Sequence, residues 1–264
     1  MNNSVPLKRF GQNYLQDHNI IRKIISEIDP QENDRIIEIG PGHGALTQFL
    51  FPGKWDFSAI EIDKRVIDDL SVRFNGINII REDFLNIDLN NFIKKPGETI
   101  RIAGNIPYNI TSPILFKLFE NNNIIKDAVL MVQLEVAKRM TAERGSKDYG
   151  ILSVLLNFFG ETRQVFKVSR NVFFPKPNVD SAIVHIFFNK NRTDSQFNLA
   201  FKSIVKSSFG NRRKTLKNSL ANSIFGPIDF SGSTIDLSLR AEQLTVKDFI
   251  ILTEFVLNYK PINE

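Results

Sequence analysis

Short apolar runs separated by polar turns mark the first half of the chain. The runs have the length and the apolar, β-branched character of buried strands and lie at residues 35–39, 57–62, 78–80, 100–103 and 126–133. Residues 20–28 carry isoleucines at helical spacing behind Asp17, a residue type that favours helix N-termini. A second helix is expected at residues 45–51. We expect Gly104 to end the strand at 100–103. Strands alternating with helices predict an open α/β sheet.

The second half of the chain changes from strands to helices. A charged helix is expected at residues 135–144, an apolar helix at 149–159, and a pair of edge strands at 161–168 and 181–188. Residues 171–180 contain two prolines and predict a rigid loop that presents Phe173 and Phe174. A polar linker at 189–195 then divides the chain into domains 1–190 and 191–264. The second domain is expected to hold two helices within 196–222, broken at Gly210, and a helix at 246–258.

Composition narrows the class of protein. The chain has no cysteine and three scattered histidines among 264 residues, so disulfides, thiol chemistry and a cysteine-zinc site are excluded and no metal site is expected. No apolar run approaches the roughly 20 residues of a membrane span, and residues 1–8 hold no apolar signal segment. We therefore expect a cytoplasmic protein with no membrane partner.

A glycine loop follows the first predicted strand of the sheet. Gly40 and Gly42 lie between this strand and a helix, a layout that lets backbone amides approach a nucleotide-like ligand. Glu61 ends the next strand, about 20 positions later, where an acid suits a ribose diol. Asp83 follows the third strand, where it can accept a hydrogen bond from an adenine amino group, with Phe84 beside the ring. The glycine spacing alone does not separate NAD from S-adenosylmethionine.

The sequence Asn-Ile-Pro-Tyr at residues 105–108 carries the most specific chemistry. Asn105 offers an amide oxygen as acceptor, and Pro107 stiffens the turn and biases Ile106 toward an extended backbone. Tyr108 offers a flat face. These groups together can hold a planar base with an exocyclic amine, and the loop at 171–180 offers a second aromatic face. The alternative is a strand-to-loop turn with a buried Tyr.

The charge of the chain is concentrated after residue 196. The formal net charge is +5, and residues 196–222 hold six basic residues and no acid: Lys202, Lys206, Arg212, Arg213, Lys214 and Lys217. A patch of one sign is what phosphate binding needs, although a solvated basic face is the simpler explanation. Residues 8–15 form a basic, aromatic arm suited to covering a ligand or contacting nucleic acid.

Six motifs in this order resemble the small-subunit (16S) ribosomal RNA adenine dimethyltransferases. They lie at residues 10–15, 38–47, 105–108, 173–181, 212–220 and 239–244. The resemblance implies a Rossmann-like methyltransferase domain with a small all-helical C-terminal domain, and S-adenosylmethionine as the methyl donor. It implies transfer of two methyl groups to N6 of each of two adjacent adenosines, in a hairpin near the 3′ end of that RNA. We expect a monomer that acts on an immature 30S-type particle during subunit maturation.

The same resemblance assigns roles to single residues. It implies that Asn13, Leu15, Gly40 and Gly42 contact the cofactor, that Glu61 holds its ribose and that Asp83 holds its adenine. Asn105 would lie between cofactor and target base, with the backbone carbonyl of Ile106 as a second acceptor for the N6 hydrogens. Tyr108 and Phe173 would sandwich the target adenine. His43 and Ile106 depart from the commonest residues of the family.

Three other functions remain open from the sequence. A related class with the same motifs methylates large-subunit RNA and confers antibiotic resistance, but the segment at 239–244 favours the small-subunit family. An NAD-dependent oxidoreductase fits the glycine loop but leaves residues 105–108 unexplained. A non-catalytic ribosome-assembly factor would use the fold as a scaffold, against which the intact Asn-Ile-Pro-Tyr sequence argues.

Overall fold

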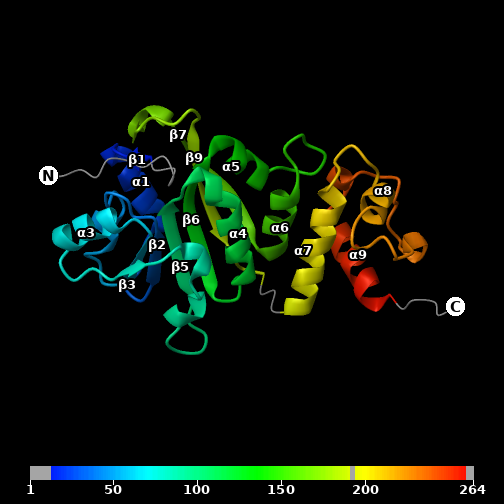
Figure 1. Ribbon diagram of the computed structural model, residues 1–264, viewed down its shortest axis with the longest axis horizontal. Helices are drawn as coiled ribbons and strands as arrows, with labels where there is room; N and C mark the ends of the chain where they lie inside the picture. The colour runs from blue at the N-terminus through cyan, green and yellow to red at the C-terminus, as the bar shows by residue number, and fades with distance from the viewer. Residues whose placement is uncertain (1–12, 191–193, 260–264) are drawn as a thin grey trace. The chain divides into compact units, whose positions relative to one another are not determined.

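The computed structural model describes residues 13–190 and 194–259 of the chain (Figure 1). It divides into two compact units. The first holds the chain up to Ala137 together with Thr162–Asn189, and the second holds Lys138–Glu161 together with the chain from Lys190 onward. The expected boundary near residue 190 coincides with one crossing between the units. Residues 138–161, which we expected in the first domain, group with the second unit instead.

A seven-stranded sheet forms the first unit, in the order β4-β3-β2-β5-β6-β9-β7. Its strands are β2 (Arg35–Ile39), β3 (Asp56–Glu61), β4 (Ile79–Arg81), β5 (Ile100–Asn105), β6 (Ile125–Gln133), β7 (Glu161–Val168) and β9 (Ser181–Phe187). The pairs from β4 to β6 are parallel, and β6 pairs with β9 antiparallel. This confirms the predicted α/β sheet, including β7 beside β9 at one edge.

The order of the strands places a ligand site. The chain runs from β2 outward to β3 and β4, and then returns to the other side of β2 with β5. Such a reversal leaves a crevice at the carboxyl ends of the two central strands, which is where open α/β sheets bind ligands.

Strand β5 is longer than the sequence predicted. We expected Gly104 to end it, yet the strand continues through Gly104 to Asn105. A Cβ atom built on Gly104 would lie 2.6 Å from the carbonyl oxygen of Ile39 in β2. Glycine is therefore required here for the close approach of β5 to β2, and Asn105 becomes the last residue of a paired strand.

Of the helices of the first unit, the first two lie at predicted positions, the second with shorter bounds, whereas the other two were not predicted. The helices are α1 (His18–Ile28), α2 (Thr47–Leu50), α3 (Lys64–Arg73) and α4 (Thr111–Glu120). The Asp17 side chain accepts from the amides of Asn19 and Ile20, as expected for an N-cap. In Figure 1, α3 lies beside the β3–β4 end of the sheet.

A two-stranded sheet was not predicted. Strand β1 (Tyr14–Leu15) pairs antiparallel with β8 (Phe173–Phe174), and the Gln16 amide donates to the Val172 carbonyl at 2.9 Å. The pairing ties the segment before α1 to the proline-containing loop. Proline has no backbone N–H to donate, and β8 precedes both prolines of the loop. The residues of β8 therefore keep the amides that the pairing needs.

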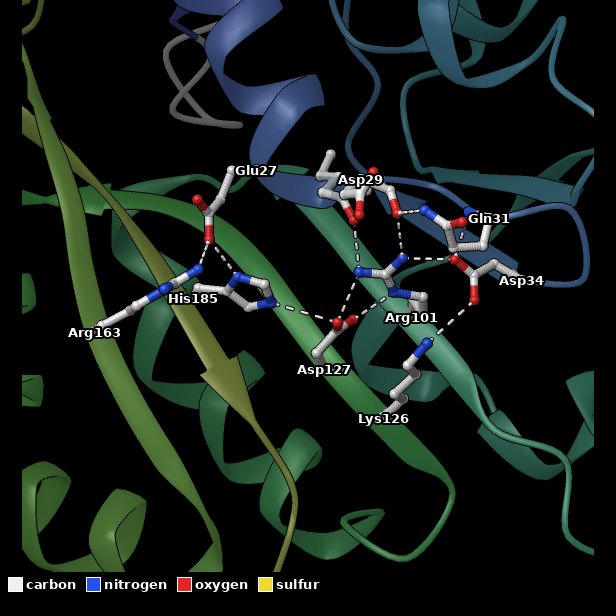
Figure 2. Close-up of polar contacts among 10 residues, drawn as sticks. Glu27, Asp29, Gln31, Asp34, Arg101, Lys126, Asp127, Arg163 and His185 are labelled. Atoms are coloured by element: carbon white, nitrogen blue, oxygen red, sulfur yellow. Dashed lines mark hydrogen bonds and ion pairs between the residues drawn. The ribbon is translucent and has the colours of Figure 1, made fainter.

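A network of charged side chains joins α1 to the sheet (Figure 2). The buried Arg101 guanidinium binds Asp127 through two nitrogens and also binds Asp34, at 2.5–2.8 Å. It donates as well to the carbonyls of Ile28 and Asp29 at the end of α1. His185 lies between Asp127 and Glu27. Every donor of Arg101 thus ties β5 to a neighbouring element.

The second unit is helical. Its helices include α6 (Ile151–Phe159), α7 (Ser195–Phe209), α8 (Leu216–Ala221) and α9 (Val246–Asn258), and α5 (Leu134–Met140) crosses from the first unit. The expected break near Gly210 is confirmed. Helix α5 ends before the expected residue 144, and α6 begins at Ile151 and not at Tyr149. Within the described residues, no helix has the length and apolar character needed to span a bilayer.

Candidate active site

A cavity of about 340 Å³ opens at the carboxyl ends of the central strands. Its size falls within the range of roughly 300–1,000 Å³ typical of small-molecule sites. Ten of the predicted site residues line it: Asn13, Leu15, Gly40, Gly42, Glu61, Asp83, Asn105, Ile106, Pro107 and Tyr108. They come from the ends of β2, β3 and β5, from the turn after β4 and from the segment around β1. The fold therefore brings together residues up to 95 positions apart, from Asn13 to Tyr108.

The glycine loop has a backbone that other residues would strain. Gly42 has φ +52°, and a Cβ atom there would lie 2.9 Å from the Tyr14 ring. The amide of Gly40 donates to the Ile60 carbonyl at 2.9 Å, which holds the loop against β3. The loop thus lies close to the segment around β1 and leaves its backbone exposed to the cavity.

Glu61 is held by backbone amides. Its Oε1 accepts from the amides of Ile62 and Asp63, both at 2.9 Å. Burial raises the pKa of Glu61 above its usual value, although these amides and that of Gly42 oppose the rise. The carboxyl group is therefore fixed in place where a ligand hydroxyl can donate to it.

Asp83 and Phe84 lie after β4. The Asp83 Oδ1 accepts from the Leu85 amide at 2.9 Å, and Phe84 is buried. The Lys117 ammonium of α4 lies 5.7 Å from the centroid of the Phe84 ring and donates to the Leu85 carbonyl at 2.8 Å. The turn that carries Asp83 is thereby fixed to α4.

Asn105 is oriented by the segment before β1. Its Nδ2 donates to the Asn13 carbonyl at 2.9 Å. An amide that donates in one direction directs its oxygen the other way, so the Asn105 Oδ1 is available as an acceptor. The sequence predicted Asn13 as a cofactor contact and did not indicate this hydrogen bond.

Glu38 also lines the cavity, although no role was predicted for it. It is 2 % exposed, and its Oε2 accepts from the Thr47 hydroxyl of α2 at 2.7 Å. Burial raises the pKa of Glu38 to about 8, and repulsion from Glu61 acts in the same direction. The hydrogen bond from Thr47 opposes this rise. The signal was available, because Glu38 is an acid inside an otherwise apolar run before the glycine loop.

The charge of the lining separates two classes of ligand. Glu38, Glu61, Glu82 and Asp83 line the cavity, and the lining residues that the structure describes include no Lys or Arg. Because its raised pKa keeps Glu38 largely protonated at neutral pH, the acidic character of the lining comes from the other three residues, which disfavour the pyrophosphate of NAD and suit a ligand with a positive charge. S-adenosylmethionine carries a sulfonium and an ammonium group and therefore fits the donor set.

Phe173 is not brought into the cavity. It is 4 % exposed, packs in the hydrophobic core of the first unit and pairs with Leu15, whereas Phe174 is 59 % exposed. Alternation of side chains along a strand sends these two neighbours to opposite sides. The sandwich of the target base between Tyr108 and Phe173 is therefore not present in this structure and stays a prediction.

The basic residues of the second unit have different surroundings. Lys202 is 8 % exposed, so it is not a solvated cation of the run. Arg212 donates to the carbonyls of Lys147 and Tyr149 at 3.0 and 3.1 Å. Lys206, Arg213, Lys214 and Lys217 are exposed. Residues 8–12 of the predicted arm and 191–193 of the linker lie outside the described residues. The described residues contain no cluster of metal-binding side chains.

Comparisons with known proteins agree with the site. The family model described as ribosomal RNA adenine dimethylase matches residues 6–257. The chain is 45 % identical to the ribosomal RNA small subunit methyltransferase A of Chlorobium phaeobacteroides, over 93 % of this chain and 91 % of that protein. It is 41 % identical to the protein of the same name from Francisella tularensis subsp. novicida, over 94 % and 97 %.

Two solved structures extend the comparison. A dimethyladenosine transferase from Plasmodium falciparum is 26 % identical with a TM-score of 0.75, over 92 % of this chain and 97 % of that one. The 23S rRNA methyltransferase ErmE is 25 % identical with a TM-score of 0.65, over 91 % and 98 %. The fold is thus shared with RNA methyltransferases over nearly the whole chain.

Proposed function

Because this chain belongs to the ribosomal RNA adenine dimethylase family, we propose that its cavity holds S-adenosylmethionine and that residues 105–108 present the target adenine to it. The protein is an S-adenosylmethionine-dependent enzyme that dimethylates adenine in small-subunit ribosomal RNA. The finer assignment is N6 of two adjacent adenosines in a hairpin near the 3′ end. The observation that carries the assignment of residues is the convergence of ten predicted residues on one cavity.

Each part of the cavity has a proposed task toward the cofactor. Glu61 accepts from the ribose hydroxyls, Asp83 accepts from the adenine amino group, and Gly40 and Gly42 allow the methionine part to approach the backbone. Asn13 and Leu15 close the cavity from the segment around β1. These roles are supported by the burial of Glu61, by the amides that fix both carboxyl groups and by the lack of basic residues in the described lining.

S-adenosylmethionine supplies a methyl group on a sulfonium sulfur, which becomes a neutral thioether when the methyl carbon bonds to N6. Adenine N6 is a weak nucleophile, because its lone pair is delocalised into the ring. The Asn105 Oδ1 and the Ile106 carbonyl accept its hydrogens and favour a lone pair directed out of the ring. An amide has no basic character at neutral pH, so Asn105 would orient N6 without abstracting its proton; methyl transfer would leave N6 positively charged and strongly acidic, and its proton would then pass to water.

Tyr108 provides the face on which the target base stacks. Base–aromatic stacking contributes about 1–3 kcal/mol per base, and the target leaves its own stack as in other base-modifying enzymes. Pro107 limits the backbone freedom of this turn. Holding the reacting atoms in place then lowers the barrier without a strong base.

The test is nucleoside mass spectrometry of small-subunit RNA, in unmethylated 30S-type particles and as free RNA, after incubation with protein and S-adenosylmethionine. We expect N6,N6-dimethyladenosine at two adjacent positions, more of it in the particles, and a loss of rate on the order of 10²–10³ for Asn105→Ala. Methylation of large-subunit RNA alone, or full rate in Asn105→Ala, would contradict the proposal. We further propose that the protein acts as a monomer in the cytoplasm, which sedimentation and cell fractionation test.

A further inference from the structure

The Tyr108 hydroxyl has a partner that the proposed mechanism does not use. It lies 2.6 Å from the Oγ of Ser181, the first residue of β9. Ser181 is fully buried, and Tyr108 is half-buried at the start of a 3-10 turn after β5. The hydrogen bond joins two residues that are 73 positions apart in the sequence.

We propose that Ser181 is a positioning residue, which fixes the plane of the Tyr108 ring against which the target adenine stacks. A tyrosine ring has two side-chain torsions, and a hydrogen bond at its far end restrains both. A tyrosine hydroxyl ordinarily keeps its proton at neutral pH, and burial raises the pKa of Tyr108 further, so this hydroxyl can donate to Ser181. The turn at residues 107–110 restrains the ring from its backbone side, and the hydrogen bond restrains its far end.

The other end of the hydrogen bond belongs to the rigid part of the fold. Ser181 is in register with Gln133 of β6, at one end of an antiparallel pair that extends to Asp127 and Phe187. The preceding residue, Asp180, accepts from the amides of Leu134 and Arg170, at 2.9 and 3.0 Å. The hydrogen bond therefore fixes the Tyr108 ring to the central sheet. Asn105 and Gly40 are fixed to the same sheet, because they lie at the ends of its strands.

This inference rests on the proposed role of Tyr108 in stacking. A ring held in one plane lets the base arrive without first ordering the protein, so the hydrogen bond acts on the rate of transfer and not on binding of the cofactor. Methylation of monomethyladenosine should be more sensitive to it, because that base has one N6 hydrogen fewer with which to reach the two acceptors.

The experiment is a double-mutant cycle of Ser181→Ala and Tyr108→Phe, each of which removes one half of the same hydrogen bond. Single-turnover methyl transfer is measured with mono- and dimethyladenosine separated by mass spectrometry. Each single variant should lose about two- to tenfold in rate and accumulate monomethyladenosine, and the double variant should lose no more than either. The affinity for S-adenosylmethionine should stay unchanged.

Ser58→Ala is the matched control. Ser58 is also a buried strand serine, whose Oγ accepts from Asn78 Nδ2 at 2.8 Å, away from residues 105–108. It should keep the full rate even where it lowers the unfolding midpoint as much as Ser181→Ala does. If Ser181→Ala does not fold, Tyr108→Phe alone serves as the test, and an unchanged rate in it overturns the proposal.

Two further outcomes separate the inference from the function beneath it. Additive losses in the cycle, or full rate in Ser181→Ala, overturn the positioning role alone. Full rate in Tyr108→Ala overturns the stacking role of Tyr108, on which the proposed function relies.

Discussion

At the scale of single residues, the polar side chains of the cavity are held by hydrogen bonds on one side. Asn105 donates to the Asn13 carbonyl, Tyr108 contacts Ser181, Thr47 donates to Glu38, and two amides donate to Glu61. Each hydrogen bond restrains a rotamer, so that Asn105 can offer its Oδ1 and Tyr108 the face of its ring to a ligand. Preorganisation of this kind lowers the cost of binding and of reaching the transition state.

The ribose role of Glu61 predicts an effect on affinity. Glu61→Ala should weaken S-adenosylmethionine binding by roughly ten- to a hundredfold, because a hydrogen bond to a charged acceptor is removed from a buried site. Calorimetric titration measures this change, with the unfolding midpoint as the control for folding. Glu82→Gln is the comparison variant, since Glu82 is exposed at the same cavity. Equal effects in both variants would remove the special role of Glu61.

The pKa of Glu38, raised to about 8, predicts how stability depends on pH. Above its ordinary pKa the unfolded chain releases this proton while the folded protein keeps it, so folding stability falls as pH rises from about 5 to 8. The slope reaches at most about 1.4 kcal/mol per pH unit. Glu38→Gln is neutral at every pH and can still accept from Thr47.

The measurement compares the free energies of unfolding of the apoprotein and of Glu38→Gln between pH 5 and 8. Because groups other than Glu38 and its neighbour Glu61 titrate alike in both proteins, the difference between the two curves reports Glu38 and its repulsion with Glu61. We expect the variant to gain relative stability as pH rises. Parallel curves would mean that Glu38 ionises normally.

At the scale of secondary-structure elements, the charged network in Figure 2 ties α1 to four strands, β5, β6, β7 and β9. Arg101 is the second residue of the strand that ends at Asn105, and α1 follows the segment that carries Asn13. The network lies at the start of β5, so it fixes the elements that deliver site residues without touching the cavity. Breaking a buried pair leaves an uncompensated charge, which is strongly destabilising.

Asp127→Asn should therefore lower the free energy of unfolding by about 3–5 kcal/mol, because the buried Arg101 loses its two-nitrogen interaction with a carboxylate. Asp56→Asn is the control: Asp56 also pairs with an arginine, Arg35, but is 42 % exposed, and it should cost at most about 1 kcal/mol. Urea unfolding measures both. Similar losses in the two variants would show that burial of the network has no special effect.

The same network predicts acid sensitivity. Burial alone would raise the pKa of Asp127, but hydrogen bonds from His185 and Arg101 and the charge of Arg101 hold that pKa below its ordinary value. The pKa of Asp34 is lowered in the same way, by the Gln31 amide and Arg101 against burial. A lowered carboxyl pKa contributes stability above the ordinary value, which is lost as pH falls through the folded pKa, below about pH 4. Asp127→Asn should lose less stability in this range than the unchanged protein.

At the scale of the whole molecule, the acidic side chains of the cavity and the exposed basic run lie in different units. Carboxyl groups line the cavity of the sheet unit, whereas exposed basic residues gather between α7 and α8 of the helical unit. This division suits a cationic cofactor in one unit and the phosphates of RNA on the other. The RNA-binding role of the basic run stays a prediction. The contacts of each basic side chain determine which of them can be substituted in a test.

Neutralising Arg213, Lys214 and Lys217 to glutamine should weaken RNA binding while cofactor affinity is kept. For every phosphate that these side chains neutralise, the substitution should reduce the log–log slope of affinity against salt by roughly 0.7–0.9. Arg212 is left out, because it donates to the Lys147 and Tyr149 carbonyls and its removal would disturb the helical unit. Binding is measured between low and physiological salt, and an unchanged slope would identify the run as a solvated face.

The sequence by itself determined the order of the elements and the chemistry at the strand ends. Apolar runs, the Asp17 cap, the glycine loop and the polar residues after each strand depend on local preferences. Because parallel strands present their carboxyl ends at one edge, residues as distant as Gly40 and Tyr108 were expected at one site, and the family resemblance added Asn13; the cavity includes all three.

Only the tertiary structure decided which neighbouring residue faces the core and which polar group finds a partner. Phe173 is buried while Phe174 is exposed because β8 pairs with β1, and Gly104 continues its strand because β2 lies against it. The burial of Lys202 and the hydrogen bond of Tyr108 with Ser181 likewise depend on residues distant in sequence. These features arise from packing between elements, which local patterns of residues do not encode.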